Sequence, residues 1–333
     1  MPASGNVPAL EGVELRTVAA NGIRLRYADA GNGPAVLFCH GFPESWYSWR
    51  HQIRALSQAG FRCVAPDMRG YGGSESPEDI ERFTMLDLVG DMVALLRELD
   101  VPKAVVVGHD WGAIVAWHCA LLRPDLFHAV VGMSVPFNPR GSVDFLSALR
   151  SAGISTFYSQ YFQEPGVAEA ELERDVRASL RRIYFTASGD NTTGLGCFGE
   201  LPPGKGLLDS SVDPEVLPDW LSEADLDWFA SEFSRTGFRG GPNWYRNFTR
   251  NWYLMAPWYG QVIRQPSLFI AGQRDDVLRF PGAMKRVESF PTLLPGIRGC
   301  HLLEGTGHWV QQERPDDVNR LLLQFLGSLD TPS

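Results

Sequence analysis

The chain has 333 residues, of which 44% are hydrophobic and 21% are charged, a composition typical of a globular protein with a large apolar core. Its formal net charge of -9 provides no positive field for nucleic acid or anionic lipid, so small or neutral partners fit better. No run approaches the roughly 18 to 20 apolar residues that cross a bilayer, and the N-terminus lacks the basic and apolar segments of an export signal.

The cysteine and histidine spacings argue against a disulfide framework and against a metal site. The cysteines are odd in number, widely spread, and form no C-x-x-C pair of the kind that binds zinc or supports redox chemistry. His301 and His308 are seven residues apart with no carboxylate at ligand spacing. We therefore expect no metal or other cofactor, and reduced, mostly buried thiols in a cytoplasmic protein. The cysteines are Cys39, Cys63, Cys119, Cys197 and Cys300.

The first third of the chain alternates short apolar runs with amphipathic stretches, which predicts βαβ units around a mostly parallel sheet. Residues 14–18 and 23–29 are expected to form an N-terminal hairpin. The helical spacing of Leu, Val and Met over residues 86–99 predicts a crossover helix. The expected central strands, each bounded by turn residues, are 35–39, 62–66, 104–108 and 129–134.

A different pattern begins near Pro136 and continues to Pro257. Aromatic residues become denser, clear buried strands disappear, and residues 171–185 have the spacing of an amphipathic helix. A Gly-rich stretch follows over 187–206. This part of the chain is expected to be a separate helical insertion.

Strand-like runs return after the insertion, at residues 266–272 and 300–305, and residues 318–329 predict a final amphipathic helix. The sheet is therefore expected to resume. We predict a core domain made of residues 1–136 and 257–333, interrupted by a helical cap domain over residues 137–256.

The pentapeptide from Gly108 to Gly112 lies between a predicted strand and the apolar run AIVAWHCALL, which has the length of a buried helix. Flanking glycines let strand and helix pass closely while the central side chain, here Asp110, is exposed in a strained turn. The alternative is an ordinary turn in which Asp110 caps the helix. The strand–turn–helix context favours a nucleophile, and the positive end of the helix favours an ionised carboxylate.

A carboxylate nucleophile restricts the chemistry. Attack of Asp110 on an ester carbonyl would give a mixed anhydride, so the side chain is better matched to displacement at a saturated carbon, which gives an alkyl ester of the enzyme. Epoxides and alkyl halides are electrophiles of this kind. A Ser-type esterase is disfavoured because Asp stands where Ser would be required.

Two backbone N–H groups are placed to stabilise an oxyanion. The strand at 35–39 is followed by His40-Gly41-Phe42-Pro43-Glu44. In a sheet with a nucleophile at such a strand–turn–helix, the N–H of Phe42 would face the turn that carries Asp110. The N–H of Trp111, directly after the nucleophile, would be the second donor.

His308 is the candidate base because it lies in a Gly-flanked loop, residues 305–309, after the last predicted strand. With Asp110 as nucleophile and an acid between the two, His308 completes the order nucleophile, acid, base along the chain. Asp275 is the favoured acid, since it follows the strand at 266–272, and Asp276 is the alternative; both could instead shape a surface turn. The acid would accept the Nδ1 hydrogen bond of His308 and stabilise the imidazolium.

Six motifs together resemble the epoxide hydrolases of the α/β-hydrolase superfamily, and the resemblance extends from about Val13 to Leu326. It implies the α/β-hydrolase fold, with a mostly parallel eight-stranded sheet flanked by helices and an inserted helical cap. It also implies a small apolar epoxide and water as reactants, no cofactor, and a possible homodimer. The motifs are HGFPESWYSWR, DMRGYGGS, GHDWGA, YFQEPGVAEAELE, NWYRN and GHWVQQE.

The resemblance further implies that two cap tyrosines hold and protonate the epoxide oxygen. Tyr158 and Tyr245 take these positions, and Tyr161, three residues after Tyr158, is the competing candidate for the first. The insertion residues 187–206 do not match the mammalian members of the family well, which leaves substrate size and selectivity open. Because GHDWGA also occurs in haloalkane dehalogenases, a dehalogenase with the same nucleophile and a non-catalytic ligand-binding member of the fold remain as alternatives.

Overall fold

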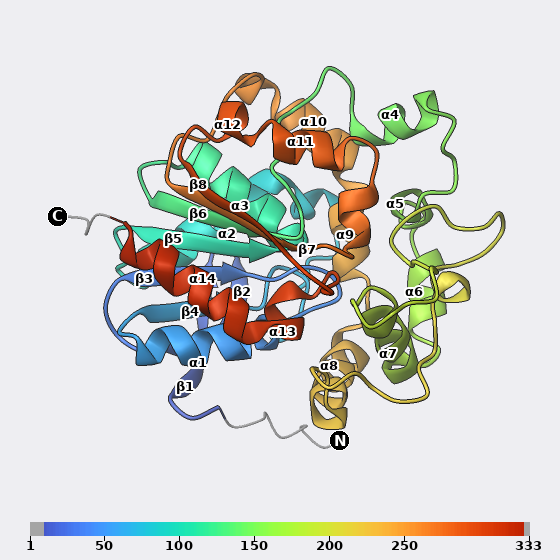
Figure 1. The fold of residues 1–333 in the computed structure, drawn as a ribbon, viewed down its shortest axis with the longest axis horizontal. Helices are drawn as coiled ribbons and strands as arrows, with labels where there is room; N and C mark the ends of the chain where they lie inside the picture. Colours follow the sequence, from blue (N-terminus) through green and yellow to red (C-terminus); the bar gives the residue numbers. More distant parts are fainter. Residues whose placement is uncertain (1–9, 330–333) are drawn as a thin grey trace.

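The computed structural model describes residues 10–329 and contains an eight-stranded sheet in the order β1-β2-β4-β3-β5-β6-β7-β8 (Figure 1). The first two strands form an antiparallel hairpin, β2 pairs antiparallel with β4, and the other neighbouring pairs are parallel. The predicted hairpin and mostly parallel sheet are confirmed. The strands are β1 (Val13–Ala20), β2 (Ile23–Ala30), β3 (Ala35–Cys39), β4 (Arg62–Pro66), β5 (Ala104–His109), β6 (Phe127–Met133), β7 (Ser267–Gly272) and β8 (Ile297–Leu303).

The centre of the sheet forms the core of the molecule. Strands β3, β5 and β7 are buried along their whole lengths. Central parallel strands that are covered on both faces need apolar side chains at consecutive positions rather than at alternate ones. The continuous apolar runs AVLFC, AVVVG and SLFIAG meet this requirement.

Four helices next to the sheet pack against each other in two pairs. Helix α1 contacts α14 and β4, whereas α2 contacts α3, which lies on β5 and β6. Helix α2 begins with a capping box in which Thr84 and Asp87 exchange hydrogen bonds. The predicted crossover helix over 86–99 is therefore found within one residue of its expected limits.

The helices outside the insertion include four short 3-10 turns, which are labelled η. They are η1 (Trp46–Trp49), α1 (Arg50–Gln58), η2 (Ile80–Phe83), α2 (Met85–Glu98), α3 (Trp111–Leu122), η4 (Ala256–Trp258), η5 (Asp276–Arg279), α11 (Ala283–Glu288), α12 (Phe290–Leu293), α13 (Val310–Glu313) and α14 (Pro315–Gly327).

The segment between β6 and β7 is helical, as expected, and gathers on the side of the sheet where β5 ends (Figure 1). Its limits, 137–256, remain a prediction. Besides η4, which spans the predicted end of the insertion at residue 256, its helices are α4 (Phe145–Ser151), α5 (Tyr158–Tyr161), α6 (Val167–Leu172), α7 (Val176–Thr186), η3 (Leu208–Ser210), α8 (Glu223–Thr236), α9 (Gly240–Arg246) and α10 (Phe248–Leu254).

The prediction of one amphipathic helix over 171–185 is wrong. The structure divides this stretch between α6 and α7, because the Asp175 side chain accepts a hydrogen bond from the N–H of Ala178 and so starts a new helix. The final helix also begins earlier than expected, at Pro315, a residue whose fixed φ suits a first helical turn.

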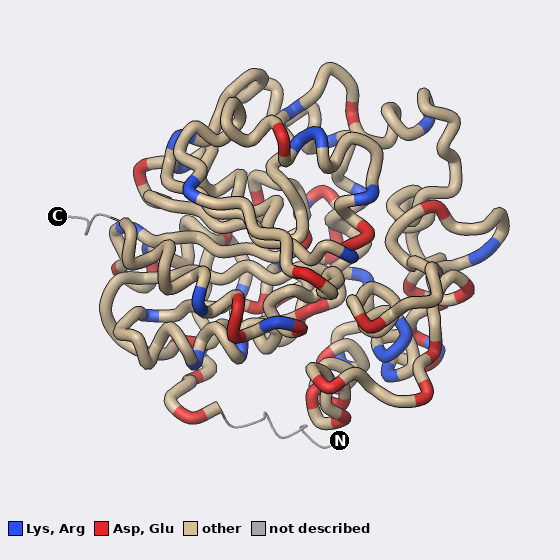
Figure 2. Tube along the Cα trace, in the orientation of Figure 1, with Lys and Arg blue, Asp and Glu red and all other residues tan. Residues whose placement is uncertain are grey.

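Charged residues of both signs are interspersed along the trace in Figure 2. Within residues 10–329, no helix has the length and apolar character needed to cross a membrane. Residues 1–9 and 330–333, which belong to the predicted core domain, lie outside the described residues. Most of the N-terminal stretch, for which the sequence predicts no export signal, therefore also lies outside the described residues.

Candidate active site

Asp110 occupies the sharp turn between β5 and α3, with φ of 53° and ψ of -122°. Residues other than glycine rarely adopt a positive φ. Close packing of the neighbouring backbone explains how this turn is held. A Cβ on Gly108 would lie 2.0 Å from the carbonyl oxygen of Gly112, and a Cβ on Gly112 would lie 1.9 Å from that of Cys39. Both glycines are therefore needed for strand β3, strand β5 and helix α3 to approach.

The Asp110 carboxylate does not cap α3 with a hydrogen bond, which argues against the reading of this residue as a simple helix cap. Instead its Oδ1 accepts a hydrogen bond from the backbone N–H of Phe42 at 2.8 Å. Gly41 permits this contact, since a Cβ there would lie 2.2 Å from the same oxygen. The structure thus brings Phe42, an expected oxyanion donor, to the expected nucleophile, next to Trp111 at the start of α3.

His308 lies between two carboxylates. Its Nδ1 is 3.1 Å from Oδ1 of Asp275, and its Nε2 is 3.6 Å from Oδ2 of Asp110. All three residues are buried. Burial alone would lower the pKa of His308, but the charges of Asp275 and Asp110 and the hydrogen bond to Asp275 outweigh it and raise that pKa well above its usual value.

The two acid candidates behave differently in the structure. Asp275 contacts His308, whereas the Asp276 carboxylate pairs with Arg279 at 3.2 Å. Burial raises the pKa of Asp276 to about 6. Of the two neighbours, Asp275 is the one in hydrogen-bonding contact with the histidine.

Tyr158 on α5 and Tyr245 on α9 lie side by side, with ring centroids 5.7 Å apart. Tyr245 also packs edge-on against Trp111, with centroids 5.0 Å apart. Burial raises the pKa of both tyrosines, and the nearby charge of Asp110 adds to the shift. Both hydroxyls are therefore neutral donors at neutral pH.

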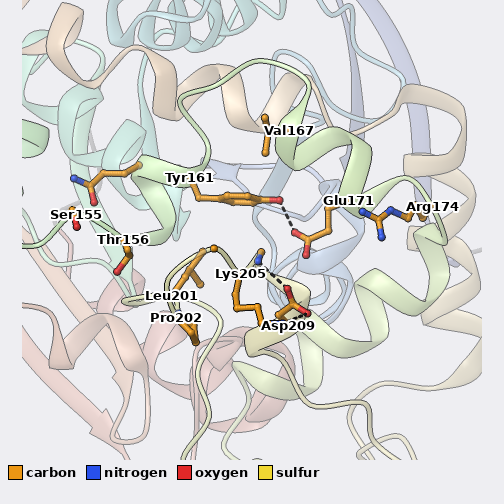
Figure 3. Close-up of a pocket in the computed structure, with 13 residues that line it drawn as sticks. Ser155, Thr156, Tyr161, Val167, Glu171, Arg174, Leu201, Pro202, Lys205 and Asp209 are labelled. Atoms are coloured by element: carbon orange, nitrogen blue, oxygen red, sulfur yellow. Dashed lines mark hydrogen bonds and ion pairs between the residues drawn. The ribbon is translucent and has the colours of Figure 1, made fainter.

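Tyr161 points elsewhere. Its hydroxyl donates to Glu171 at 2.8 Å and lines a cavity of about 590 Å³ within the helical insertion (Figure 3). Charged and apolar side chains both line that cavity, including Arg174, Lys205 and Val167. Neither Asp110 nor His308 belongs to its lining, so the structure groups Tyr158, and not Tyr161, with the other site residues.

Two buried residues were missed by the sequence reasoning. Oε2 of Glu44 is 2.8 Å from Nδ1 of His109, and Nε2 of His109 is 2.7 Å from the backbone oxygen of His308. Burial acts to raise the pKa of Glu44, but His109 and the N–H of Gly41 lower it to about 2. Both residues stand inside motifs that were noted, HGFPE and GHDWG, yet no local pattern indicates that they pair with each other.

Among residues 10–329, no group of three or more His, Cys, Asp or Glu side chains has an arrangement that could hold a metal ion. The Asp110 carboxylate thus lies with a histidine that has its own carboxylate, the backbone N–H of Phe42 and the neighbouring phenols of Tyr158 and Tyr245. This set can carry out nucleophilic attack followed by base-assisted hydrolysis.

Comparison with known proteins agrees with this geometry. Residues 34–315 match the family model described as alpha/beta hydrolase fold. The chain is 46% identical over 320 residues to Epoxide hydrolase A of Mycobacterium tuberculosis, covering 95% of this chain and 98% of that protein. The chain belongs to the epoxide hydrolases of the α/β-hydrolase fold. The resemblance stated from the motifs is thereby confirmed.

Two further relatives support the assignment. Epoxide hydrolase 1 of Siraitia grosvenorii is 41% identical over 320 residues, with 95% of this chain and 99% of that protein covered. Among solved structures, an epoxide hydrolase from an endophytic Streptomyces superimposes with a TM-score of 0.90 at 46% identity, covering 95% of this chain and 96% of that one.

Proposed function

We propose that this protein hydrolyses epoxides to vicinal diols in two steps, through an ester formed on Asp110. The observation that carries the proposal is the meeting of three kinds of group at one buried place. These are a carboxylate at a strained elbow, a His–Asp pair 3.6 Å from it, and two neutral phenols. Relatives of nearly the same length are named epoxide hydrolases.

In the first step, Asp110 attacks the less hindered ring carbon. The new C–O bond forms as the bond between that carbon and the ring oxygen breaks, and the electron pair moves to the ring oxygen. Tyr158 and Tyr245 donate hydrogen bonds to this oxygen, and one of them transfers its proton. Since burial raises the pKa of both phenols, each keeps its proton until negative charge develops on the substrate.

In the second step, His308 removes a proton from water, and the resulting hydroxide attacks the ester carbonyl carbon of Asp110. The N–H groups of Phe42 and Trp111 stabilise the oxyanion. The ester C–O bond then breaks, and the leaving alkoxide takes the proton of the new Asp110 carboxyl group, which releases the diol. The proton held by His308 returns to the tyrosinate.

The two steps are linked through the pKa of His308. Asp110 contributes to raising that pKa in the free enzyme, and a histidine acts as a base only when it is neutral. Formation of the ester removes the negative charge of Asp110. The pKa of His308 therefore falls at the point in the cycle where a base is needed.

A dehalogenase with the same nucleophile would leave the paired tyrosines without a role. We therefore predict that the protein converts styrene oxide to its diol and releases no bromide from 1-bromobutane under the same conditions. Asp110→Ala should abolish diol formation in a folded sample. Bromide release without diol formation would overturn the proposal, and inertness toward epoxides of varied size would favour a binding protein.

The finer features of the protein are also proposals. We infer that residues 137–256 act as a cap over the site, and that the protein works in the cytoplasm, as supported by the free cysteines, four of which are buried. A homodimer is proposed by analogy with the family, and light scattering should then give about twice the chain mass of 37.0 kDa.

A further inference from the structure

The short segment from Ala187 to Gly189, at the end of α7, contacts the loops that carry His308 and Asp275. The backbone oxygen of Ala187 accepts a hydrogen bond from the N–H of His308 at 2.8 Å. The carbonyl oxygen of Gly189 accepts one from Nη1 of Arg274, the neighbour of Asp275, at 2.6 Å. A segment of the insertion is thus bonded to His308 and to the residue that precedes Asp275.

Glu313, the last residue of α13, joins the same place from the other side. Its carboxylate accepts hydrogen bonds from the N–H of Gly189 at 2.9 Å, of Gly307 at 2.8 Å and of Trp309 at 2.9 Å. The last two N–H groups flank His308 in the chain. Burial raises the pKa of Glu313 to about 7, and the three N–H groups oppose this shift, so these bonds help to keep the carboxylate ionised.

The backbones of the three segments touch at glycines. A Cβ on Gly189 would lie 2.0 Å from the oxygen of Gly305, and a Cβ on Gly307 would lie 2.4 Å from the nitrogen of Gly189. A Cβ on Gly272, at the end of β7, would lie 2.2 Å from the oxygen of Gly307. The three backbones therefore lie so close together that no side chain fits between them at these positions.

From these contacts we infer that Glu313 is a positioning residue, which fixes His308 against Asp275 by tying the His308 loop to the segment 187–189. The inference rests on the proposed function. His308 and Asp275 follow different strands, β8 and β7, so their separation depends on what joins the two loops. The paired strands and two backbone hydrogen bonds join these loops directly, from the N–H of Gln273 to the oxygen of Leu303 and from the N–H of Arg274 to the oxygen of Thr306, each at 2.9 Å. The segment 187–189 adds a further connection.

The effect should concentrate on the second chemical step. His308 acts as base in hydrolysis of the ester, whereas formation of the ester uses Asp110, Tyr158 and Tyr245. The two tyrosines have a link of their own, since Nε2 of Gln163 donates to the backbone oxygen of Ser159 in α5 at 2.7 Å and of Tyr245 in α9 at 3.1 Å. Loss of the Glu313 bonds therefore leaves the first step in place.

The test is a rapid-quench comparison of the wild type with Glu313→Gln, using styrene oxide and mass analysis of the Asp110 peptide. An amide has the size of the carboxylate but offers only one acceptor oxygen to the three N–H groups. We expect ester formation at the wild-type rate, ester hydrolysis slowed about 10-fold, and accumulation of the ester. The control is Asp317→Asn. Asp317 is a half-exposed residue of α14, the helix after α13, and its carboxylate pairs with Arg320 of the same helix.

The outcomes separate the positioning role from folding and from the proposed function. Wild-type rates for both steps in Glu313→Gln, or equal slowing of both steps, would overturn the inference. If Glu313→Gln does not fold, a second variant, Arg274→Gln, removes the hydrogen bond between the Asp275 loop and Gly189. This variant should also slow ester hydrolysis selectively. Unchanged ester hydrolysis in Arg274→Gln would again overturn the inference. Absence of an Asp110 ester in the wild type would instead refute the proposed function.

Discussion

At the scale of single residues, the site depends on how burial and neighbouring charge set the protonation of His308. Two carboxylates raise its pKa in the free enzyme, and one of them, Asp110, loses its charge when the ester forms. Asp275 contacts Nδ1 of His308 and takes no part in ester formation. The base strength of His308 is therefore linked to the chemical state of the nucleophile.

This linkage predicts how the two steps depend on pH. As pH falls through the pKa of His308 in the ester intermediate, the imidazole becomes protonated and cannot accept a proton from water, so ester hydrolysis should slow about 10-fold per pH unit. Ester formation does not use His308 as a base and should continue. Rapid quenching at decreasing pH should show the Asp110 ester accumulating. Hydrolysis that is independent of pH wherever the ester still forms would contradict this role for His308.

Candidate residues that are marked by their local sequence could be named in advance, whereas contacts between distant positions could not. Asp110 stands out because flanking glycines, a strand and a helix surround it within a few positions. Glu44 and His109 are 65 positions apart, and Glu313 meets Gly189 across 124 positions. A carboxylate in a motif does not reveal which distant donor it will contact, because that depends on the register and packing of the whole sheet.

At the scale of elements, the turn between β5 and α3 depends on close backbone packing. Gly112→Ala places a Cβ 1.9 Å from the oxygen of Cys39 in β3, where backbone rather than a flexible side chain must move. We expect the free energy of unfolding to fall by about 2 kcal/mol or more, measured by urea denaturation. Gly327→Ala, in α14, meets no atom within 4 Å, and should change that free energy by less than about 1 kcal/mol. Equal stability of the two variants would contradict this account of the turn.

Element types were predicted more readily than element limits. The capped helix α2 was found where its apolar spacing placed it. The stretch 171–185 keeps a helical spacing across two helices, because Asp175 interrupts the backbone pattern without disturbing the apolar positions. Periodicity reports which face is buried, whereas the break depends on one side-chain hydrogen bond.

At the scale of the whole molecule, the sheet and the helical insertion both contribute residues to the candidate site. The sheet supplies Asp110, Asp275 and His308 at the ends of β5, β7 and β8, and the insertion supplies Tyr158 and Tyr245. Strand types and the return of the sheet after the insertion could be read from apolar runs. The strand order and the approach of residues 187–189 to the His308 loop could not, because both arise from contacts between segments far apart in the chain.

The central claim is that Asp110 becomes esterified by the substrate and is then released by attack of water on its own carbonyl carbon. The most direct test is a single turnover of styrene oxide in ¹⁸O-water with enzyme in excess, followed by mass analysis of the Asp110 peptide and of the diol. We predict that one ¹⁸O atom enters the Asp110 carboxylate and that the diol of this first turnover carries none. Label in the diol with an unlabelled Asp110 peptide would mean that water attacks the epoxide directly, and would contradict the account.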